Sequence, residues 1–417
     1  MRRLLGSGIF IIIMLLIDWY VFQAVKLVSQ QASTKVKIII YGLYWGVTLL
    51  AVTVFLFGST LNLENWPKQI RTYLFAVLIG LFMGKFIAAT VFLVDDLRRV
   101  LHWTGGKLYY QFVQNENFTS STITRSTFMS WLGIGLGSTL FGSLLWGFGN
   151  KYRYQLKKMK LTFDDLPSAF KGLKVLHISD IHSGSFSDIR SVEKGVQKIL
   201  DEKPDIILFT GDLVNDKADE MKDYQEMFSR LKAPMGVYST LGNHDYGDYY
   251  QWDSKEAKIT NLQNLKTVHS DMGWKLLMNE HVVLEKDGQE VALIGIENWS
   301  AKANFPRYGK LPQAYEGTEK YPFKILMSHD PSHWDAEVKK DYKDIQLMLS
   351  GHTHGMQFGL EIPGFHWSPV QYVYKQWAGL YEDLQQKQKL YINRGFGFIG
   401  YPGRVGILPE ITVIELV

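Results

Sequence analysis

The sequence predicts a layered α/β domain that follows an all-α, four-helix transmembrane region. Two observations predict this division. The first 150 residues contain long apolar runs, whereas residues 151–417 contain short apolar runs separated by polar and glycine-containing segments. The charge divides at the same point: residues 1–150 hold 12 Lys and Arg against 5 Asp and Glu, and the remainder holds 33 against 36.

Four apolar stretches are each long enough to cross a bilayer, which takes about 20 residues as a helix. They cover residues 8–28, 36–58, 72–94 and 127–149. Four spans place both termini on one side, and flanking basic residues such as Arg2, Arg3 and Lys151 slightly favour the cytoplasm for the domain that follows. We therefore predict a multi-pass protein of the cell membrane that contacts the lipid bilayer, with a transmembrane region over 1–150.

Two charged residues fall near the middle of predicted spans, Asp18 in the first and Lys85 in the third. Ionisable groups are costly in hydrocarbon, so such residues usually pair or face water. We expect Asp18 and Lys85 to pair between helices. The alternative is that each helix is shifted and its charge reaches an interface.

The second half alternates apolar runs of strand length with helix-like segments, which predicts a layered α/β architecture with a buried sheet core. The strand-like runs are 173–179, 205–209, 236–241, 291–296, 323–328, 345–349, 390–393 and 411–417, and the clearest helical segments are 188–202 and 217–231. Residues 286–289 (KDGQ) are typical of a hairpin turn. We expect a basic juxtamembrane linker over 151–169 and the domain over 170–417.

Polar clusters follow five of the strand-like runs. They are SDIH at 179–182, TGD at 210–212, GNHD at 242–245, HD at 329–330 and GHTHG at 351–355. In open α/β sheets, ligands bind beyond the carboxyl ends of the strands, so the five clusters can meet at one edge. Carboxylate, imidazole and amide groups suit hard or borderline divalent cations, and the chain has no Cys to supply thiolate ligands.

The spacing of these residues suggests how they share the ions. On extended backbone, residues two apart project to the same side, so Asp180 and His182 can reach one ion. His352 and His354 have the same spacing, although a loop there could direct them to different ions. Five of the 11 histidines fall in the clusters, which argues against a purely structural set. The remaining histidines have no motif context and are interpreted as structural: His102, His177, His269, His281, His333 and His366.

The order D-x-H, GD, GNHD, lone His and GHTHG resembles the calcineurin-like metallophosphoesterase family over about residues 170–417. The family's fold is a sandwich of two β-sheets flanked by helices. The resemblance implies a first metal ion on Asp180, His182 and His354, a second on Asn243, His329 and His352, and Asp212 as the bridge. It also implies that His244 acts beside the phosphate as a general acid or stabiliser, with Asp245 orienting it. The tail from Asn393 (NRGFGFIGYPGRVGILPEITVIEL) is similar to the bacterial membrane-associated branch of the YkuE and YaeI type.

The predicted activity is metal-dependent hydrolysis of a phosphoric ester. A hydroxide between two cations attacks phosphorus in line, and His244 assists the leaving group. Manganese, iron and zinc all suit the ligand set, with manganese favoured. Arg394 and Arg404 could bind phosphate, because arginine forks fit its oxygens, or could be structural.

The substrate is left open among several classes. A membrane anchor favours a lipid-linked phosphodiester, phosphomonoester or diphosphate. The Trp- and Tyr-rich segment 356–381 could line an apolar groove, lie at a membrane interface or pack in the core. A UDP-diacylglucosamine-type diphosphatase and an enzyme for a soluble phosphodiester such as a cyclic nucleotide are alternatives. The near-balanced charge of residues 151–417 argues against a nucleic acid polymer as partner.

A rival of another class is a membrane sensor or transporter with a regulatory phosphoesterase-like domain, and only Asp18 and Lys85 support it.

Overall fold

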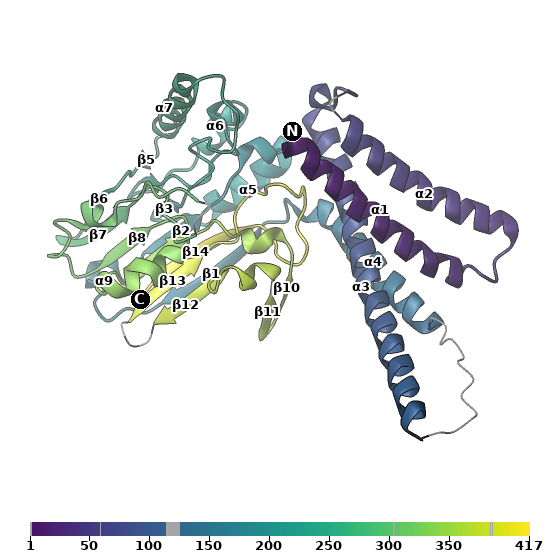
Figure 1. Cartoon of the computed structure of the whole chain (residues 1–417). Helices are drawn as coiled ribbons and strands as arrows, with labels where there is room; N and C mark the ends of the chain where they lie inside the picture. The colour runs from purple at the N-terminus through teal and green to yellow at the C-terminus, as the bar shows by residue number, and fades with distance from the viewer. Residues whose placement is uncertain (1, 59, 114–125, 303–304, 384, 386) are drawn as a thin grey trace. The chain divides into compact units, whose positions relative to one another are not determined.

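The computed structural model describes residues 2–58, 60–113, 126–302, 305–383, 385 and 387–417. It consists of two compact units, Met1–Trp146 and Gly147–Val417 (Figure 1).

The first unit contains four helices that are long and apolar enough to cross a membrane. They are α1 (Arg2–Val28), α2 (Thr34–Phe57), α3 (Lys68–Val113) and α4 (Thr127–Gly147). Helix α3 is longer than the predicted span 72–94 because it continues through a polar segment. There, Asp95 and Asp96 pair with Arg98 and Arg99 one turn later, and such pairs support a helix outside hydrocarbon.

The predicted pairing of Asp18 with Lys85 is confirmed. The Lys85 Nζ atom lies 2.8 Å from Asp18 Oδ1, and Thr48 donates a hydrogen bond to the other carboxylate oxygen. The Lys85 ammonium also lies 4.4 Å from the centroid of the Tyr44 ring. The two charges are therefore neutralised by contacts among helices α1, α2 and α3. This structural role accounts for Asp18 and Lys85, which had been the only support for a sensor or transporter.

The second unit is built on two six-stranded sheets. The first has the order β1-β14-β2-β3-β4-β5, with strands β1 (Gln155–Leu161), β14 (Glu410–Leu416), β2 (Lys174–Ile178), β3 (Ile206–Phe209), β4 (Val237–Ser239) and β5 (Lys275–Leu276). The second has the order β12-β13-β9-β8-β7-β6, with strands β12 (Gly379–Asp383), β13 (Gln388–Ile392), β9 (Leu347–Ser350), β8 (Lys324–Met327), β7 (Gln289–Gly295) and β6 (Glu280–Lys286). A separate hairpin pairs β10 (Leu360–Ile362) with β11 (Phe365–Trp367).

The two sheets face each other across an apolar core, as the sandwich prediction requires. Val175 and Leu208 of the first sheet belong to one buried cluster with Ile325 and Leu349 of the second. Helices α5 (Ile189–Asp201) and α7 (Lys255–Asp271) contribute to the cluster on the other face of the first sheet (Figure 1). The second sheet is flanked by α8 (Leu311–Tyr315) and a π-helical turn over Trp334–Val338. Helices pack on the outer faces of the two sheets, so a site can form at the ends of the strands.

Most predicted elements are confirmed: each strand-like run overlaps a strand, α5 matches 188–202, and the turn at 287–288 joins β6 to β7. Segment 217–231 differs. It forms a 3-10 turn (Ala218–Met221) and the short helix α6 (Gln225–Phe228). The Ala218 amide donates to the Asn261 side chain, so a tertiary contact replaces a continuous helix there.

Residues 155–161 of the expected linker over 151–169 form strand β1 of the first sheet, which pairs with β14 in parallel over seven residues. Its lysines obscured the strand in the sequence. Two of them lie toward solvent and form ion pairs, Lys158 with Glu202 and Lys160 with Glu415. Charged side chains of this kind are common on edge strands, where they block pairing with other chains.

Candidate metal centre

The polar clusters come together because the strands that precede them are parallel neighbours. In the first sheet β2, β3 and β4 run in parallel and are followed by SDIH, TGD and GNHD. In the second sheet β8 and β9 run in parallel and are followed by HD and GHTHG. Their carboxyl ends thus deliver the side chains to one edge.

Asp180, His182 and His354 form the first group of metal-ligating side chains, with one donor atom from each within 4.8 Å of the others. The Nε2 atoms of His182 and His354 are 3.1 Å apart, and His354 Nε2 is 3.2 Å from Asp180 Oδ1. All three side chains are buried. The two histidines of GHTHG separate here, because His352 belongs to the other group.

Asp212, His329 and His352 form the second group, again with donor atoms within 4.8 Å of one another. His329 Nε2 lies 3.1 Å from Asp212 Oδ2. Asn243 joins this group through its amide oxygen, which lies 2.8 Å from His352 Nδ1. The structure thus brings together all seven side chains that the resemblance implies as ligands.

The Asp212 carboxylate lies between the two groups. Its Oδ2 atom is 3.1 Å from His329 Nε2 in the second group and 3.5 Å from His182 Nε2 in the first. An oxygen in this position can contact ions in both groups, as a bridging carboxylate does.

The backbone at these residues is not extended, contrary to the expectation for D-x-H. Five of the seven side chains sit on residues with positive φ: Asp180, His182, Asp212, His352 and His354. Such a conformation costs of order 1–3 kcal/mol for a non-glycine residue and persists only where the surroundings fix it. Here the Asp180 amide donates to the Gly211 carbonyl and the His352 amide donates to the Asp180 carboxylate. The D-x-H residues therefore reach their positions through sharp turns after the strand.

Two glycines let these turns approach one another. A Cβ atom on Gly351 would lie 2.1 Å from Asp180 Oδ2, and one on Gly242 would lie 2.2 Å from Asp212 Oδ1. Any side chain at either position would collide with a carboxylate of the centre, so close packing of the backbone accounts for both glycines.

Hydrogen bonds orient the histidine rings. His329 Nδ1 lies 2.7 Å from the Thr210 carbonyl, which can only accept, so the proton is on Nδ1 and Nε2 faces Asp212. His352 Nε2 lies 2.9 Å from the Tyr374 hydroxyl, which in turn donates to Asp330 at 3.2 Å. This leaves His352 Nδ1 directed toward Asn243.

The two carboxylates of the centre favour positive charge at His329. Burial by itself would lower the pKa of His329, but the Asp212 and Asp180 carboxylates outweigh it and raise the pKa to about 10. His329 Nε2 is buried and lies 3.1 Å from Asp212 Oδ2. Converging carboxylates and imidazole nitrogens fit the donor set of divalent cations.

His244 lies beside the centre and is half-buried. Its ring centroid is 5.0 Å from that of His182, its amide donates to Asp212 Oδ1 at 2.8 Å, and its Nδ1 lies 2.9 Å from the Asn215 carbonyl. The Asn215 carbonyl, and not Asp245, therefore orients the ring. Asp245 instead accepts hydrogen bonds from the amides of Gly242, Asp212, Leu213 and Val214. The expected role of Asp245 is corrected: it holds the loop that carries Asp212.

Arg394 and Arg404 point into the protein. Arg394 contacts the carboxylates of Glu410 and Glu361 at 2.5 and 2.7 Å. Arg404 is fully buried and donates to the carbonyls of Arg394 and Gly397, and its Nη2 lies 3.2 Å from His354 Nδ1. Their positions do not support phosphate contact, and Arg404 instead packs against a metal-centre histidine.

Sequence reasoning missed Asp330, Tyr374 and Asn215. Asp330 directly follows His329 in an HD pair that repeats the HD of GNHD, and this signal was available. Tyr374 belongs to the aromatic segment 356–381, which serves different purposes along its length: Tyr374 and Trp377 are buried near the centre, whereas Phe365 and Tyr372 are exposed. The Asn215 contact is made by a main-chain carbonyl, which leaves no sequence signal.

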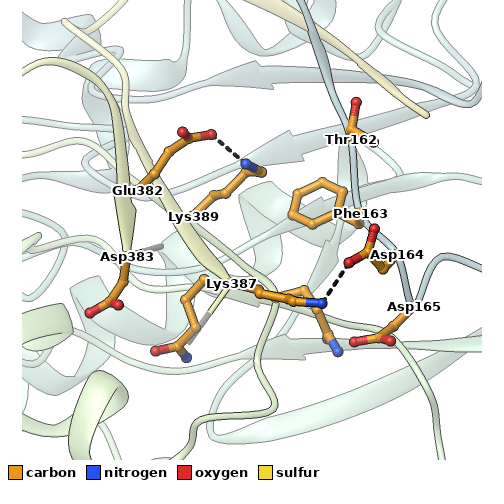
Figure 2. A pocket seen from close by; sticks show the side chains of 10 residues that line it. Thr162, Phe163, Asp164, Asp165, Glu382, Asp383, Lys387 and Lys389 are labelled. Atoms are coloured by element: carbon orange, nitrogen blue, oxygen red, sulfur yellow. Dashed lines mark hydrogen bonds and ion pairs between the residues drawn. The ribbon is translucent and has the colours of Figure 1, made fainter. Parts of the chain in front are cut away.

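A pocket lies at the opposite ends of the strands, where β1 ends and β13 begins. Figure 2 shows its carboxylates facing lysines: Lys387 lies 2.6 Å from Asp164, and Lys389 pairs with Glu382. Lys339 lies 3.1 Å from Asp383. These carboxylates pair with lysines of the chain, whereas those of the metal centre face imidazole nitrogens.

Family sequence models match both units. The model described as "Probable Calcineurin-like phosphoesterase, transmembrane domain" matches residues 1–150, and "Calcineurin-like phosphoesterase" matches residues 173–356. The first match shows that the four-helix region carries a family signal, which sequence reasoning did not find.

Several curated proteins are similar to this chain over about 60% of its length. The metallophosphoesterase YkuE of Bacillus subtilis is 30% identical over 60% of this chain and 81% of its own length. The phosphodiesterase YaeI of Escherichia coli is 28% identical over 58% of this chain and 82% of its own length. The UDP-2,3-diacylglucosamine pyrophosphatase LpxG of Chlamydia muridarum is 25% identical over 61% of this chain and 88% of its own length.

A transmembrane protein with metallophosphoesterase domain from Danio rerio is 29% identical over 62% of this chain, and the match spans 56% of that protein's length. Three observations agree on the family of this chain: the order of the motifs, the two sheets with their shared edge, and these relatives. The chain belongs to the calcineurin-like phosphoesterase family, with a four-helix transmembrane region ahead of the phosphoesterase domain.

Proposed function

We propose that this chain is a membrane-anchored phosphoesterase that uses two divalent cations. The observation that carries the proposal is the Asp212 carboxylate, which lies within 3.5 Å of a histidine nitrogen from each of two ligand groups. A purely structural cluster has no need to direct carboxylates and imidazole nitrogens toward two adjacent points.

In this proposal Asp180, His182 and His354 hold one cation, Asn243, His329 and His352 hold the other, and Asp212 contacts both. When bound, the two cations would withdraw charge from the phosphoryl oxygens and favour ionisation of water. Manganese is the first cation to test, with iron and zinc as alternatives.

His244 is proposed to handle the leaving-group proton. Its Nδ1 is engaged with the Asn215 carbonyl, so Nε2 is the atom that can hold or give a proton at the substrate. The ring is half-buried at the side of the centre, where a bound ester could reach it. Asp245 supports this chemistry indirectly, because its four amide contacts fix the Asp212 loop.

The proposed substrate is a phosphodiester or diphosphate joined to a lipid. The four apolar helices hold the domain at a bilayer, which brings lipid headgroups within its reach. Two relatives support this class by their names, LpxG as a diacylglucosamine pyrophosphatase and YaeI as a phosphodiesterase.

The basic flanks of the spans favour a domain that faces the cytoplasm. A single cysteine introduced into the domain, treated with a membrane-impermeant thiol reagent in sealed vesicles, would test this.

The deciding experiment uses the full chain in lipid nanodiscs, stripped of metal and then loaded with Mn²⁺. We expect hydrolysis of bis(p-nitrophenyl) phosphate and faster hydrolysis of a lipid-linked diphosphate such as UDP-diacylglucosamine, both abolished by chelation. Turnover of the soluble ester alone would keep the chemistry but exclude the lipid. Stoichiometric metal binding without turnover of either ester would contradict the proposal.

A further inference from the structure

The β10–β11 hairpin has its polar face toward the protein and its apolar face outward. The register pairs Leu360 with Trp367, Glu361 with His366 and Ile362 with Phe365. Side chains alternate between the faces of a strand, so Leu360, Ile362, Phe365 and Trp367 share one face, and Glu361 and His366 share the other.

The polar face is the one that contacts the rest of the second unit. Glu361 lies 2.7 Å from Arg394 and 3.5 Å from Lys157, and the His366 ring is 5.2 Å from that of Trp377. On the opposite face Leu360, Ile362 and Phe365 are 47, 51 and 52% exposed. Tyr372 and Val373, which follow the hairpin in the chain, are also exposed. In Figure 1 the hairpin stands apart from the two six-stranded sheets.

This orientation is the reverse of the usual one, in which the apolar face of a hairpin packs on the core. A two-stranded hairpin is at best marginally stable alone in water, so its ion pairs and base contacts must hold it. Contiguous exposed apolar side chains on an ordered hairpin indicate a surface that binds something apolar.

The base of the hairpin identifies the occupant, because it is tied to the end of the fourth span. Gly359 donates to the Val405 carbonyl at 2.8 Å, and the neighbouring Arg404 amide donates to the carbonyl of Gly147, where α4 ends, at 3.0 Å. Each strand of the hairpin has three residues, so its length is about 10 Å. The base of the hairpin is thus two hydrogen bonds and one peptide link away from the residue where a membrane span ends, and the hairpin extends only about 10 Å from that base.

We propose that the apolar face of the β10–β11 hairpin docks on the lipid bilayer, with Leu360, Ile362 and Phe365 at the boundary between headgroups and acyl chains. Aromatic and aliphatic side chains are those that anchor proteins at this depth. The hairpin begins six residues after His354. Docking therefore fixes the metal centre beside the headgroup layer, and this consequence rests on the proposed function.

The absence of native cysteine allows a direct test on the full chain. Pro363→Cys at the exposed hairpin turn carries an environment-sensitive fluorophore, and Glu285→Cys on exposed β6 is the matched control. In vesicles of phosphatidylcholine and phosphatidylglycerol, we expect quenchers attached to lipid acyl chains to quench the label at 363 but not the label at 285. Iodide dissolved in the water should quench the label at 285 but not the label at 363.

Equal lipid quenching at both positions, or iodide access at 363, would overturn the proposal. Protection of 363 from both quenchers would also overturn it, because protein, such as a second copy of the chain, would then cover the face.

A second measurement uses Ile362→Ser combined with Phe365→Ser, with Val283→Ser at an exposed position of β6 as control. We expect the double variant to lose lipid quenching at 363 and to hydrolyse a lipid-linked ester at least about tenfold more slowly. The reason is that it lacks two apolar side chains that the proposal places in the bilayer. Hydrolysis of the soluble ester should be unchanged in both variants. Lipid quenching without hydrolysis of any ester would leave the docking intact and refute the proposed function, whereas soluble-ester hydrolysis without quenching would refute the docking alone.

Discussion

The two ends of the sheets in the second unit both carry polar clusters, but the clusters are built in opposite ways. At the end where β13 begins, the carboxylates of Asp164 and Glu382 each face a lysine of the chain. At the other end, Asp180 and Asp212 face the imidazole nitrogens of His354 and His329. Charge alone therefore does not mark a functional cluster. The informative feature is that carboxylates meet imidazoles, and both of these groups can bind a metal ion.

The largest expected effect tests whether Asp212 is shared by both groups. Asp212→Ala removes the oxygen that lies near His182 and His329. We expect loss of bound metal from both positions and loss of essentially all turnover, measured by metal analysis and by hydrolysis of bis(p-nitrophenyl) phosphate. Retention of one equivalent of metal would show that the two groups bind independently.

His244→Ala separates chemistry from metal binding. Its ring lies beside the centre but outside both groups. We therefore expect unchanged metal content and a decrease in kcat of about 10²–10⁴-fold, the usual contribution of a general acid. An ester with a leaving group that needs no proton should lose much less. Equal losses for both esters would argue that His244 only positions the substrate.

His269 shows that burial alone does not create a metal site. Neither of its ring nitrogens has a hydrogen-bond partner among the described residues, and burial lowers its pKa to about 3. The unfolded chain takes up the proton near pH 6.5, so the native state loses stability as pH falls below that value. The loss at pH 4.5 is about 3 kcal/mol relative to pH 7.

His269→Phe should remove much of this dependence, because phenylalanine does not titrate. Thermal unfolding of both proteins between pH 7 and 4.5 measures it, and parallel curves would refute the assignment.

A smaller effect is expected at the hydrogen-bond relay behind His352. Tyr374→Phe removes the hydroxyl that links His352 Nε2 to Asp330. Partners behind a metal ligand typically contribute about 10–100-fold in metal affinity. We expect Mn²⁺ affinity to fall within that range while kcat at saturating metal changes little. A change in kcat with unaltered affinity would assign Tyr374 to substrate contact.

The smallest effect is expected at the lysine-paired end. Asp164→Asn breaks an exposed ion pair with Lys387, and exposed pairs contribute little. Metal content, kcat and melting temperature should all match those of the native chain. A loss of activity here would show that the two ends of the sheets are coupled, and the contrast between the clusters would fail.

The sequence was sufficient for much of this architecture. Strand-like runs predicted β2, β3, β8 and β9 because these strands are buried on both faces and read as continuous apolar segments. The polar clusters after them predicted the residues that the structure brings together, because strand order brings the carboxyl ends of parallel strands to one edge.

The remainder depends on tertiary contacts that local patterns do not encode. β1 is rich in lysine, and its strand conformation comes from pairing with β14. The left-handed backbone of Asp180 and His182 arises from hydrogen bonds with the Asp212 loop, which lies about thirty residues further along the chain. The contact of Asp245 with four amides was missed for the same reason, since a motif gives the residue type but not its partner.

The pairing of β1 with β14 also bears on how the protein is made. The two strands pair at a separation of 255 residues, and β14 lies between β1 and β2 in the sheet. During synthesis, β1 and β2 leave the ribosome long before β14 exists, so β1 and the edge of β2 that faces β14 stay unpaired while the rest of the domain is translated, although β2 can pair with β3. The membrane helices can insert during that interval, but the first sheet can close only after residues 410–416 emerge. Assembly of the domain is therefore a late event in biogenesis, and premature termination before β14 would leave two strand edges exposed.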